Sequence, residues 1–186
     1  LIDMFAANNR DHLLFFSDAG KVYSTKAYSI PETGRANRGT LIHSVLNLAQ
    51  GEYITAVVPI SDFELEDAYF VMATRQGRIK RVQLDEFESV RPSGLIAISL
   101  NEDDVLAWVK YTTGHQDILI VTESGQSIRF NEEEVRVMGR SAGGVNAIKL
   151  VDDDLVAGMD VIEPDTHTHV LVITRKGYGK RTPLDQ

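Results

Sequence analysis

Residues 67–81, Asp-Ala-Tyr-Phe-Val-Met-Ala-Thr-Arg-Gln-Gly-Arg-Ile-Lys-Arg, combine the features of a β-hairpin. A run of apolar and β-branched residues comes first, which predicts a strand covered on both faces. A short polar turn then closes on Gly77, because glycine tolerates the positive φ of a tight hairpin. The residues after the turn alternate in character. We therefore expect a second strand with one buried face and with basic side chains on the face toward water.

This hairpin pattern occurs four times along the 186 residues. Each copy has an apolar run, a polar turn that closes on glycine, and a second strand. The copies begin at residues 11, 67, 117 and 169, and their turn glycines are Gly20, Gly77, Gly125 and Gly177. Internal repetition at about 50 residues is typical of propellers and related architectures, so the copies predict successive units of one fold.

The second half of each unit repeats as well. The predicted third strands begin with a glycine and end with a leucine, at Gly39–Leu48, Gly94–Leu100 and Gly144–Leu150. An acidic turn then leads to predicted fourth strands at Tyr53–Ile60, Val105–Tyr111 and Leu155–Ile162. Four strands per unit is the pattern of a propeller blade, whose small sheets pack face to face. The expected fold class is therefore all-β and propeller-like.

The repeat does not divide the chain evenly. We expect three complete units and two partial ones, with Leu1–Phe5 as the last strand of a preceding unit. The predicted divisions are the end of a blade at 1–10, blades at 11–66, 67–115 and 116–167, and the first half of a further blade at 168–186. Such a set does not close a ring, and each core side chain left in water forgoes roughly 1.5–3 kcal/mol. We therefore expect a fragment of a longer domain, or an arc stabilised by contacts between molecules.

The composition, with 43% hydrophobic and 25% charged residues, is that of an ordinary globular domain. No apolar run approaches the length of a membrane helix and no signal pattern opens the chain, so we expect a soluble, cytoplasmic protein that does not contact membranes. The lack of cysteine excludes disulfides and thiolate metal sites. His167 and His169 are expected to be solvated, because a metal site needs further ligands. The net charge of −8 is unusual for a nucleic-acid-binding domain, which makes the placement of the charges important.

Charges of opposite sign occupy different parts of each unit. Basic residues gather at the glycine hairpin, on the second strand and in the loop after it, where Arg136 also lies, whereas acids fall in the other turns. A basic edge can attract phosphate although the far side is acidic, since the screening length is about 8 Å at physiological salt. We therefore expect the acids to lie away from the basic set. The candidate DNA-binding residues are Lys21, Lys26, Arg35, Arg38, Arg75, Arg78, Lys80, Arg81, Arg91, Arg129, Arg140, Arg175, Lys176, Lys180 and Arg181.

Charged strands on the outside of a β protein are ordinarily only solvated, and a single hairpin would favour that interpretation. Recurrence in at least two units, beside glycine loops where backbone amides can approach phosphate, favours a binding surface. The third unit has only Arg129 on its second strand. No recognition helix is predicted. Binding is therefore expected to be insensitive to base sequence, except through DNA bendability, and to weaken steeply with salt.

Three segments carry a resemblance to a known family. Lys21-Val-Tyr-Ser-Thr-Lys-Ala-Tyr-Ser-Ile-Pro-Glu, Val135-Arg-Val-Met-Gly-Arg and Gly177-Tyr-Gly-Lys-Arg-Thr resemble the C-terminal domain of DNA gyrase A, and the likeness runs over essentially the whole chain. The resemblance implies a β-pinwheel, a propeller relative whose blades exchange strands and whose basic rim wraps double-stranded DNA. It also implies a non-catalytic, cofactor-free part of a type II topoisomerase that introduces negative supercoils with ATP. The implied partners are the catalytic core of gyrase A and, through it, gyrase B.

One departure from the family keeps alternatives open. The family's basic heptapeptide, of the form Gln-Arg-Arg-Gly-Gly-Lys-Gly, is absent, and Gly34-Arg-Ala-Asn-Arg-Gly39 is a weaker version in the corresponding loop of the next unit. The related domain of topoisomerase IV, which lacks that motif, is therefore one alternative. A propeller that binds peptides is another, and an aromatic and charged ring around a central channel would favour it. An enzymatic site is not expected, because the carboxylates recur in turns and no phosphate-binding loop of the Walker type is present.

Overall fold

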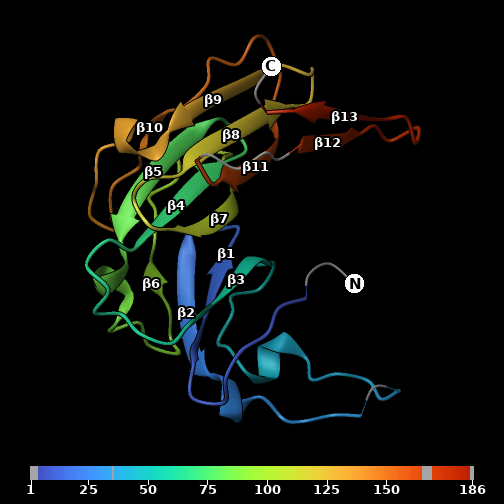
Figure 1. Ribbon diagram of the computed structural model, residues 1–186. Helices are drawn as coiled ribbons and strands as arrows, with labels where there is room; N and C mark the ends of the chain where they lie inside the picture. Colours follow the sequence, from blue (N-terminus) through green and yellow to red (C-terminus); the bar gives the residue numbers. More distant parts are fainter. Residues whose placement is uncertain (1–3, 35, 165–168, 185–186) are drawn as a thin grey trace.

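The computed structural model describes residues 4–34, 36–164 and 169–184. They form short antiparallel strands joined by turns, loops and single turns of 3-10 helix (Figure 1). The strands are β1 (His12–Ser17), β2 (Lys21–Lys26), β3 (Ile54–Ile60), β4 (Tyr69–Thr74), β5 (Arg78–Gln83), β6 (Leu95–Ile96), β7 (Leu106–Thr112), β8 (Asp117–Thr122), β9 (Ser127–Asn131), β10 (Val145–Asn146), β11 (Val156–Ile162), β12 (His169–Ile173) and β13 (Gly179–Pro183). The 3-10 helices are η1 (Ala27–Ser29), η2 (Ile42–Ser44), η3 (Leu84–Phe87) and η4 (Glu132–Glu134). None of the helices in the described ranges has the length and apolar character that a membrane crossing requires.

The sheets exchange strands between successive units. Two sheets have four strands, in the orders β3-β1-β2-β6 and β10-β5-β4-β7. In each of them the edge strand beside the second strand comes from the next unit along the chain: Val22 pairs with Leu95, and Ile79 pairs with Val145. This confirms the blade exchange that the family resemblance implies. The second and third units therefore each complete the sheet of the unit before them.

The other two sheets have fewer strands. One has the order β11-β8-β9, and the last consists of β12 and β13 alone. No strand from a following unit adds to β9 within the described residues, so its outer edge is open. The expected all-β, propeller-like β-pinwheel architecture is confirmed.

The predicted first, second and fourth strands agree with the structure to within about two residues. The third strands differ. Only Leu95–Ile96 and Val145–Asn146 form strands inside the predicted ranges, and Gly39–Leu48 contains the 3-10 helix η2 and no strand. The reason is that a third strand forms on the second strand of the preceding unit, and the described chain has none before β1. Met4 and Phe5, part of a predicted strand, are not in a strand either, and residues 1–3 lie outside the described ranges.

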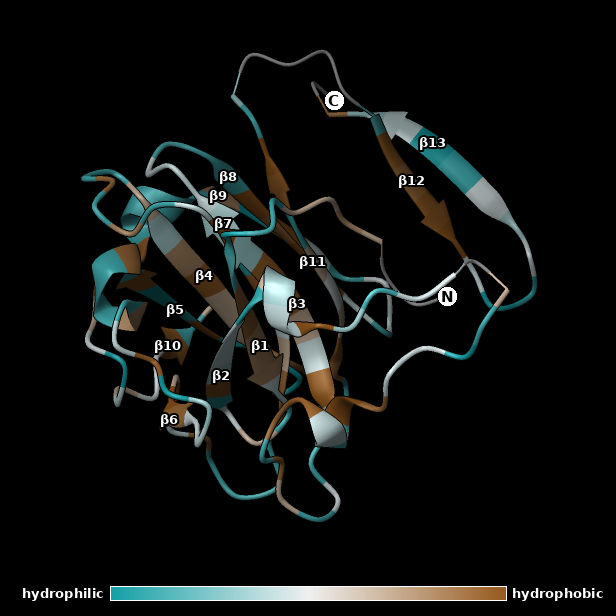
Figure 2. Ribbon diagram, turned by 90° about the horizontal axis from the view of Figure 1, so that it is seen from below, coloured by the Kyte–Doolittle hydropathy of each residue, from teal (hydrophilic) through white to brown (hydrophobic). Residues whose placement is uncertain are grey.

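Apolar faces of neighbouring sheets form the core (Figure 2). Between the first two sheets, the ring of Phe16 meets those of Phe70 and Phe87 edge to face, with centroids 5.2 and 5.9 Å apart. Both faces of β1 and β4 are buried, as the apolar runs predict. In contrast, β12 carries an apolar run that the described residues do not cover, and its Leu171 is 62% exposed.

Candidate nucleic-acid interface

The two basic residues at the centre of β5 are buried, contrary to the expectation that this strand presents them to water. Lys80 has no exposed surface and Arg81 is 9% exposed. The Lys80 ammonium lies 2.7 Å from the carbonyl oxygen of Ala97 and 3.1 Å from that of Ala142, and it also contacts the carbonyl of Arg140. The loop after β9 covers the strand at this point. The expectation that Lys80 and Arg81 are exposed to water is therefore wrong, and neither side chain is accessible to DNA phosphate in this structure.

The charge of Arg81 is neutralised inside the protein. Its guanidinium lies 3.7 Å from the buried carboxylate of Glu132 and 4.8 Å from the ring centroid of Tyr69. The pKa of Lys80 is lowered to about 8, mainly because the side chain is buried; Glu86 opposes this shift, and the nearby Arg140 adds to it. Both residues therefore belong to the packing between the second and third units.

Two further cations of the second hairpin are tied to neighbouring backbone. Arg78 is partly exposed, and its guanidinium donates to the carbonyls of Gly143 and Gly144. Arg75 forms an ion pair with Glu123 at 2.6 Å and donates to the carbonyl of Val156. Both side chains link the second unit to the third, so neither is a free cation of the hairpin.

Three arginines lie exposed in equivalent loops. Arg38, Arg91 and Arg136 follow the second strands of the first, second and third units, and each loop contains glycine. None of the ion pairs found among the described residues involves them. These loops are the cationic feature that recurs most regularly on the surface. Arg35, which also lies in the first loop, is outside the described residues.

The remaining candidates are placed in several ways. Lys26 donates to the carbonyl of Arg10 and contacts the ring of His12, and Lys21 is partly exposed at the start of β2.

Arg129 pairs with Asp117 at 2.8 Å and also donates to the carbonyl of Leu184. Arg140 lies 3.4 Å from Glu86. The exposed basic residues of the last hairpin, which form none of the ion pairs of the described chain, are Arg175, Lys176, Lys180 and Arg181.

Strand register shows what the last hairpin corresponds to. Lys80 stands opposite Met72 in the second unit, and Lys180 stands opposite Val172 in the same way. Arg181 likewise has the position of Arg81. In the second hairpin, the following unit buries these two positions. Lys180 and Arg181 are exposed because none of the described residues covers them.

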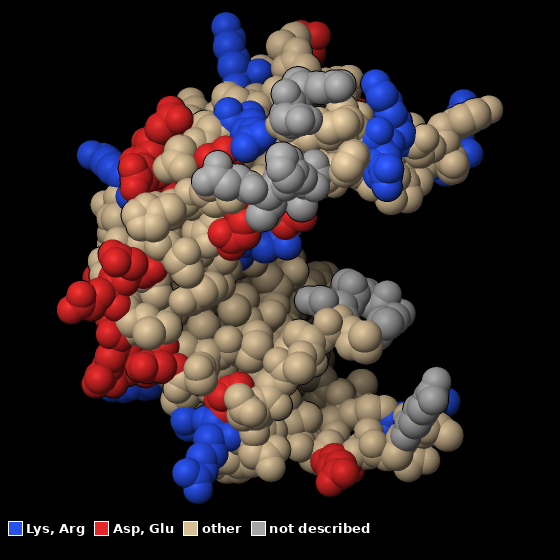
Figure 3. Space-filling model, in the orientation of Figure 1, with Lys and Arg blue, Asp and Glu red and all other residues tan. Residues whose placement is uncertain are grey.

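The acids do not lie apart from the basic hairpins, contrary to the expected segregation. The Asp104 carboxylate accepts a hydrogen bond of 3.0 Å from the amide of Gln76, in the turn that also holds Arg75. Asp154 accepts an equivalent bond of 3.0 Å from Ser124. On the face drawn in Figure 3, Lys and Arg side chains form separate groups, and Asp and Glu side chains gather along the left flank. The acids of the turns before the fourth strands thus hold the hairpin turns in place.

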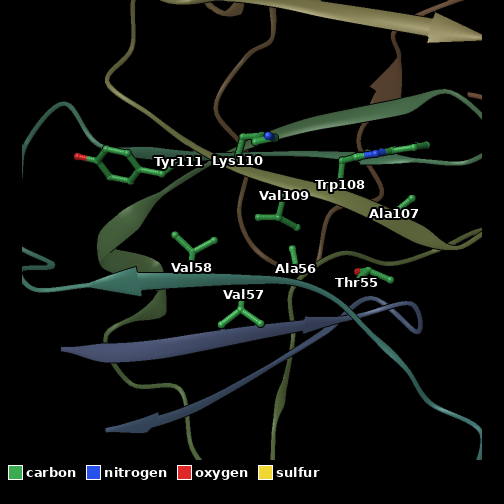
Figure 4. A pocket seen from close by; sticks show the side chains of 9 residues that line it. All are labelled: Thr55, Ala56, Val57, Val58, Ala107, Trp108, Val109, Lys110 and Tyr111. Atoms are coloured by element: carbon green, nitrogen blue, oxygen red, sulfur yellow. The ribbon is translucent and has the colours of Figure 1, made fainter. Parts of the chain in front are cut away.

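A groove between β3 and β7 is the second surface to consider (Figure 4). It has a volume of about 340 Å³, and Ala56, Val58 and Val109 point into the space between the strands. Trp108 and Lys110 also line it. The Lys110 ammonium lies 2.9 Å from the carboxylate of Asp160, so the positive charge that lines the groove is already paired.

No group of three or more potential metal ligands gathers within the part of the chain that the structure describes. Of the two histidines expected to be solvated, His169 is exposed, and His167 lies outside the described residues. Sequence reasoning named the glycine loops beside the hairpins, but it did not single out the backbone of residues 139–144, Gly-Arg-Ser-Ala-Gly-Gly. Its adjacent glycines were the available signal, because they allow close approach of the backbone to another chain or to a ligand.

Comparison with known proteins agrees with this architecture. A family model described as "DNA gyrase C-terminal domain, beta-propeller" matches residues 11–61, 68–113, 116–163 and 168–186. DNA gyrase A of Haloquadratum walsbyi is 45% identical over 186 residues, which cover 98% of this chain and 22% of that protein. DNA gyrase A of Staphylococcus epidermidis is 42% identical over 179 residues, which cover 96% of this chain and 20% of that protein. The chain thus spans about a fifth of the length of these curated relatives.

Solved structures give the same result. The C-terminal domain of DNA topoisomerase IV superposes with a TM-score of 0.87 at 29% identity, over 95% of this chain and 55% of that one. A DNA gyrase A C-terminal domain superposes with a TM-score of 0.77 at 27% identity, over 96% and 56%. The matched region is the non-catalytic C-terminal part of gyrase A, as the sequence predicts. The chain belongs to the DNA gyrase C-terminal domain family.

Proposed function

We propose that this chain binds duplex DNA without sequence preference, through phosphate contacts along the loops that follow the second strands. The observation that carries the proposal is the recurrence of Arg38, Arg91 and Arg136, which are exposed in three successive units and form none of the ion pairs of the described residues. Guanidinium groups favour phosphate geometry, and phosphate contacts fix a duplex without reading its bases. The net charge of −8 does not exclude this, because at physiological salt a phosphate responds mainly to charges within about 8 Å and not to the net charge of the chain.

Family membership supports a larger role. We infer that the domain wraps DNA as part of gyrase A and thereby supports ATP-dependent negative supercoiling by a type II topoisomerase. Its partners in this role are the catalytic core of gyrase A and, through the core, gyrase B. The place of action would be the cytoplasm. The exposed cations of the last hairpin, Arg175 and Lys176, extend the proposed surface.

Two alternatives are weaker. The groove between β3 and β7 carries Trp108, Lys110 and Tyr111, which is the kind of surface that would bind a peptide. However, its lysine is paired with Asp160, and the unpaired arginines lie in the loops instead. The topoisomerase IV domain shares the fold, whereas the curated relatives with 42–45% identity are gyrase proteins.

The test is a titration of the chain with random-sequence duplex DNA at several salt concentrations. Arg38→Ala, Arg91→Ala and Arg136→Ala should each weaken binding to all sequences alike and each reduce the slope of log K against log salt by about 0.9. Lys110→Ala removes the same charge from the groove and serves as the matched control, with no change expected in slope. A slope that falls for Lys110→Ala but not for the loop variants would move the binding surface to the groove and contradict the proposal.

A further inference from the structure

The loop at residues 140–144 turns all of its carbonyl groups toward the protein. Lys80 donates to the carbonyls of Arg140 and Ala142, and Arg78 donates to those of Gly143 and Gly144. The Ser99 hydroxyl donates to the carbonyl of Ser141 at 2.7 Å, completing five consecutive acceptors: Arg140, Ser141, Ala142, Gly143 and Gly144. Such a run is unusual for a loop, whose carbonyls normally face water in part.

The unpaired amide groups of this loop lie on the opposite side of its peptide bonds from the carbonyls. A trans peptide places its N–H opposite its C=O, and the described chain contains no cis peptide bond. The amide of Ala142 donates to Gly139. The amides of Ser141, Gly143 and Gly144 donate to no acceptor in the described part of the chain. Adjacent unpaired amides, such as those of Gly143 and Gly144, can bind an anion.

The loop packs closely against β5 at Gly144 and against Ser99 at Gly143. A Cβ at Gly144 would lie 2.4 Å from the carbonyl oxygen of Ile79, and one at Gly143 would lie 3.0 Å from that of Ser99. Arg81 also takes part through its backbone, because its carbonyl accepts the amide of Met138 at 2.9 Å. Because of this close contact, the side chains of Arg78 and Lys80 reach the loop carbonyls from β5.

In the equivalent loop of the second unit, no cation of the preceding strand binds the loop carbonyls among the described residues. By register Tyr23 of β2 corresponds to Lys80, since Phe15 and Met72 are their partners. Tyr23 donates to Glu52 at 2.8 Å, and its ring packs against Gly94 instead of donating to loop carbonyls. The loop at residues 91–94 is therefore supported by an aromatic ring, and the loop at 140–144 by two cations.

We propose that Lys80 and Arg78 are positioning residues, which hold residues 140–144 with their amides outward and so make this loop a phosphate-binding surface for DNA. Neither positive charge contacts the phosphate itself. Each instead binds the oxygen side of the peptide groups, which strengthens the donor side through cooperative polarisation. Arg136, which is exposed and precedes this loop in the sequence, supplies the direct charge contact. The inference rests on the proposed DNA-binding function.

The experiment compares Lys80→Met, Arg136→Ala and Val82→Ala in the 186-residue chain. Lys80→Met should lower the affinity for random-sequence duplex by about fivefold to tenfold, the effect of one or two lost hydrogen bonds. It should leave the slope of log K against log salt unchanged, because no phosphate-bound cation is lost. Arg136→Ala should instead reduce that slope. Val82→Ala, which removes core packing from the same strand, should change neither.

Hydrogen exchange of the backbone amides gives an independent measurement that needs no DNA. Lys80→Met should accelerate exchange selectively within residues 137–145, whereas Val82→Ala should not. Unchanged affinity and unchanged exchange in Lys80→Met would overturn the positioning role, while the proposed function would stand if the wild-type chain binds with a steep salt slope. A wild-type chain that does not bind duplex overturns the proposed function itself. If Lys80→Met does not fold, Arg78→Met applies the same two measurements from a partly exposed position.

Discussion

The guanidinium of Arg81 lies 3.7 Å from the carboxylate of Glu132, across the boundary between the second and third units. Glu132 is fully buried and also accepts hydrogen bonds from the amides of Gly114 and Gln116, each at 3.0 Å. The pair therefore joins β5 to the turn after β9. This contact explains why a strongly basic strand can lie inside the protein.

Removal of Arg81 should destabilise the fold. Loss of one member of a buried pair leaves the other charge without compensation, and Arg81→Ala should lower the free energy of unfolding by about 3 kcal/mol. Denaturant titration at constant m-value measures the change. Arg91→Ala removes an exposed arginine and should stay within about 0.5 kcal/mol. Equal effects of the two substitutions would contradict the structural role of the pair.

Gly51 and Gly94 allow the cost of backbone strain to be measured separately from the cost of a steric clash. Gly51 and Gly94 both have a φ of +81°, but a Cβ at Gly51 meets nothing within 4 Å, whereas one at Gly94 lies 2.5 Å from the Tyr23 ring. Gly51→Ala should cost about 1 kcal/mol from the left-handed backbone alone. Gly94→Ala should cost about 3 kcal/mol, because the tyrosine must also move. Thermal denaturation of both variants checks the difference, and a larger effect at Gly51 would contradict the packing described.

Glu52 should make the fold sensitive to acid. Burial alone would raise its pKa, but hydrogen bonds from Ser17, from the amide of Ala49 and from Tyr23 outweigh it and hold the pKa below the usual 4.5. The carboxylate therefore stabilises the fold above that pH, and the contribution is lost as the pH falls through the lowered pKa. Urea denaturation should show the stability gap between wild type and Glu52→Gln narrowing as the pH falls below 4.5. A stability gap that widens as the pH falls would mean that the pKa of Glu52 is raised in the folded protein.

Lys80 should act in the opposite pH range. Its pKa is about 8 in the folded protein against an ordinary value of 10.5, so between these limits the unfolded chain binds the extra proton. The Lys80 contribution to the free energy of unfolding therefore rises with pH between about 8 and 10.5 and is flat below that range. Denaturation of wild type and Lys80→Met at several pH values across this range measures it. A difference that is constant with pH would mean that the lysine keeps an ordinary pKa.

Elements that depend on neighbouring residues could be predicted from the sequence, whereas elements that depend on pairing with distant residues could not. The hairpins at Gly20 and Gly77 could be predicted, because an apolar run, a glycine turn and an alternating strand are local patterns. The short third strands could not be placed, since Leu95–Ile96 and Val145–Asn146 form by pairing with another unit. The 3-10 turn at Ile42–Ser44 shows what the same sequence pattern does without that partner. The division of the chain into blades by residue range stays a prediction.

The candidate site was harder to predict than the fold. A lysine and an arginine on an alternating strand have the pattern of a solvated face, so Lys80 and Arg81 looked exposed. Their burial depends on the carbonyls of Arg140 and Ala142 and on Glu132, all distant in sequence. Arg91 and Arg136 lie in loops, where exposure is the usual state, and their exposure followed from the sequence. The DNA-binding role of these arginines stays a prediction.

The addition of β6 to β2 sets an order of events during synthesis. When the ribosome has released the first hairpin, the outer edge of β2 has no partner, and it stays open until Leu95 and Ile96 have emerged. The same holds for β5, which waits for Val145 and Asn146. A nascent chain would therefore carry a second strand that still lacks its partner at every stage, and such open edges are sites of aggregation. Slow translation between units would lengthen the exposure of that edge, so this architecture favours rapid, uninterrupted elongation.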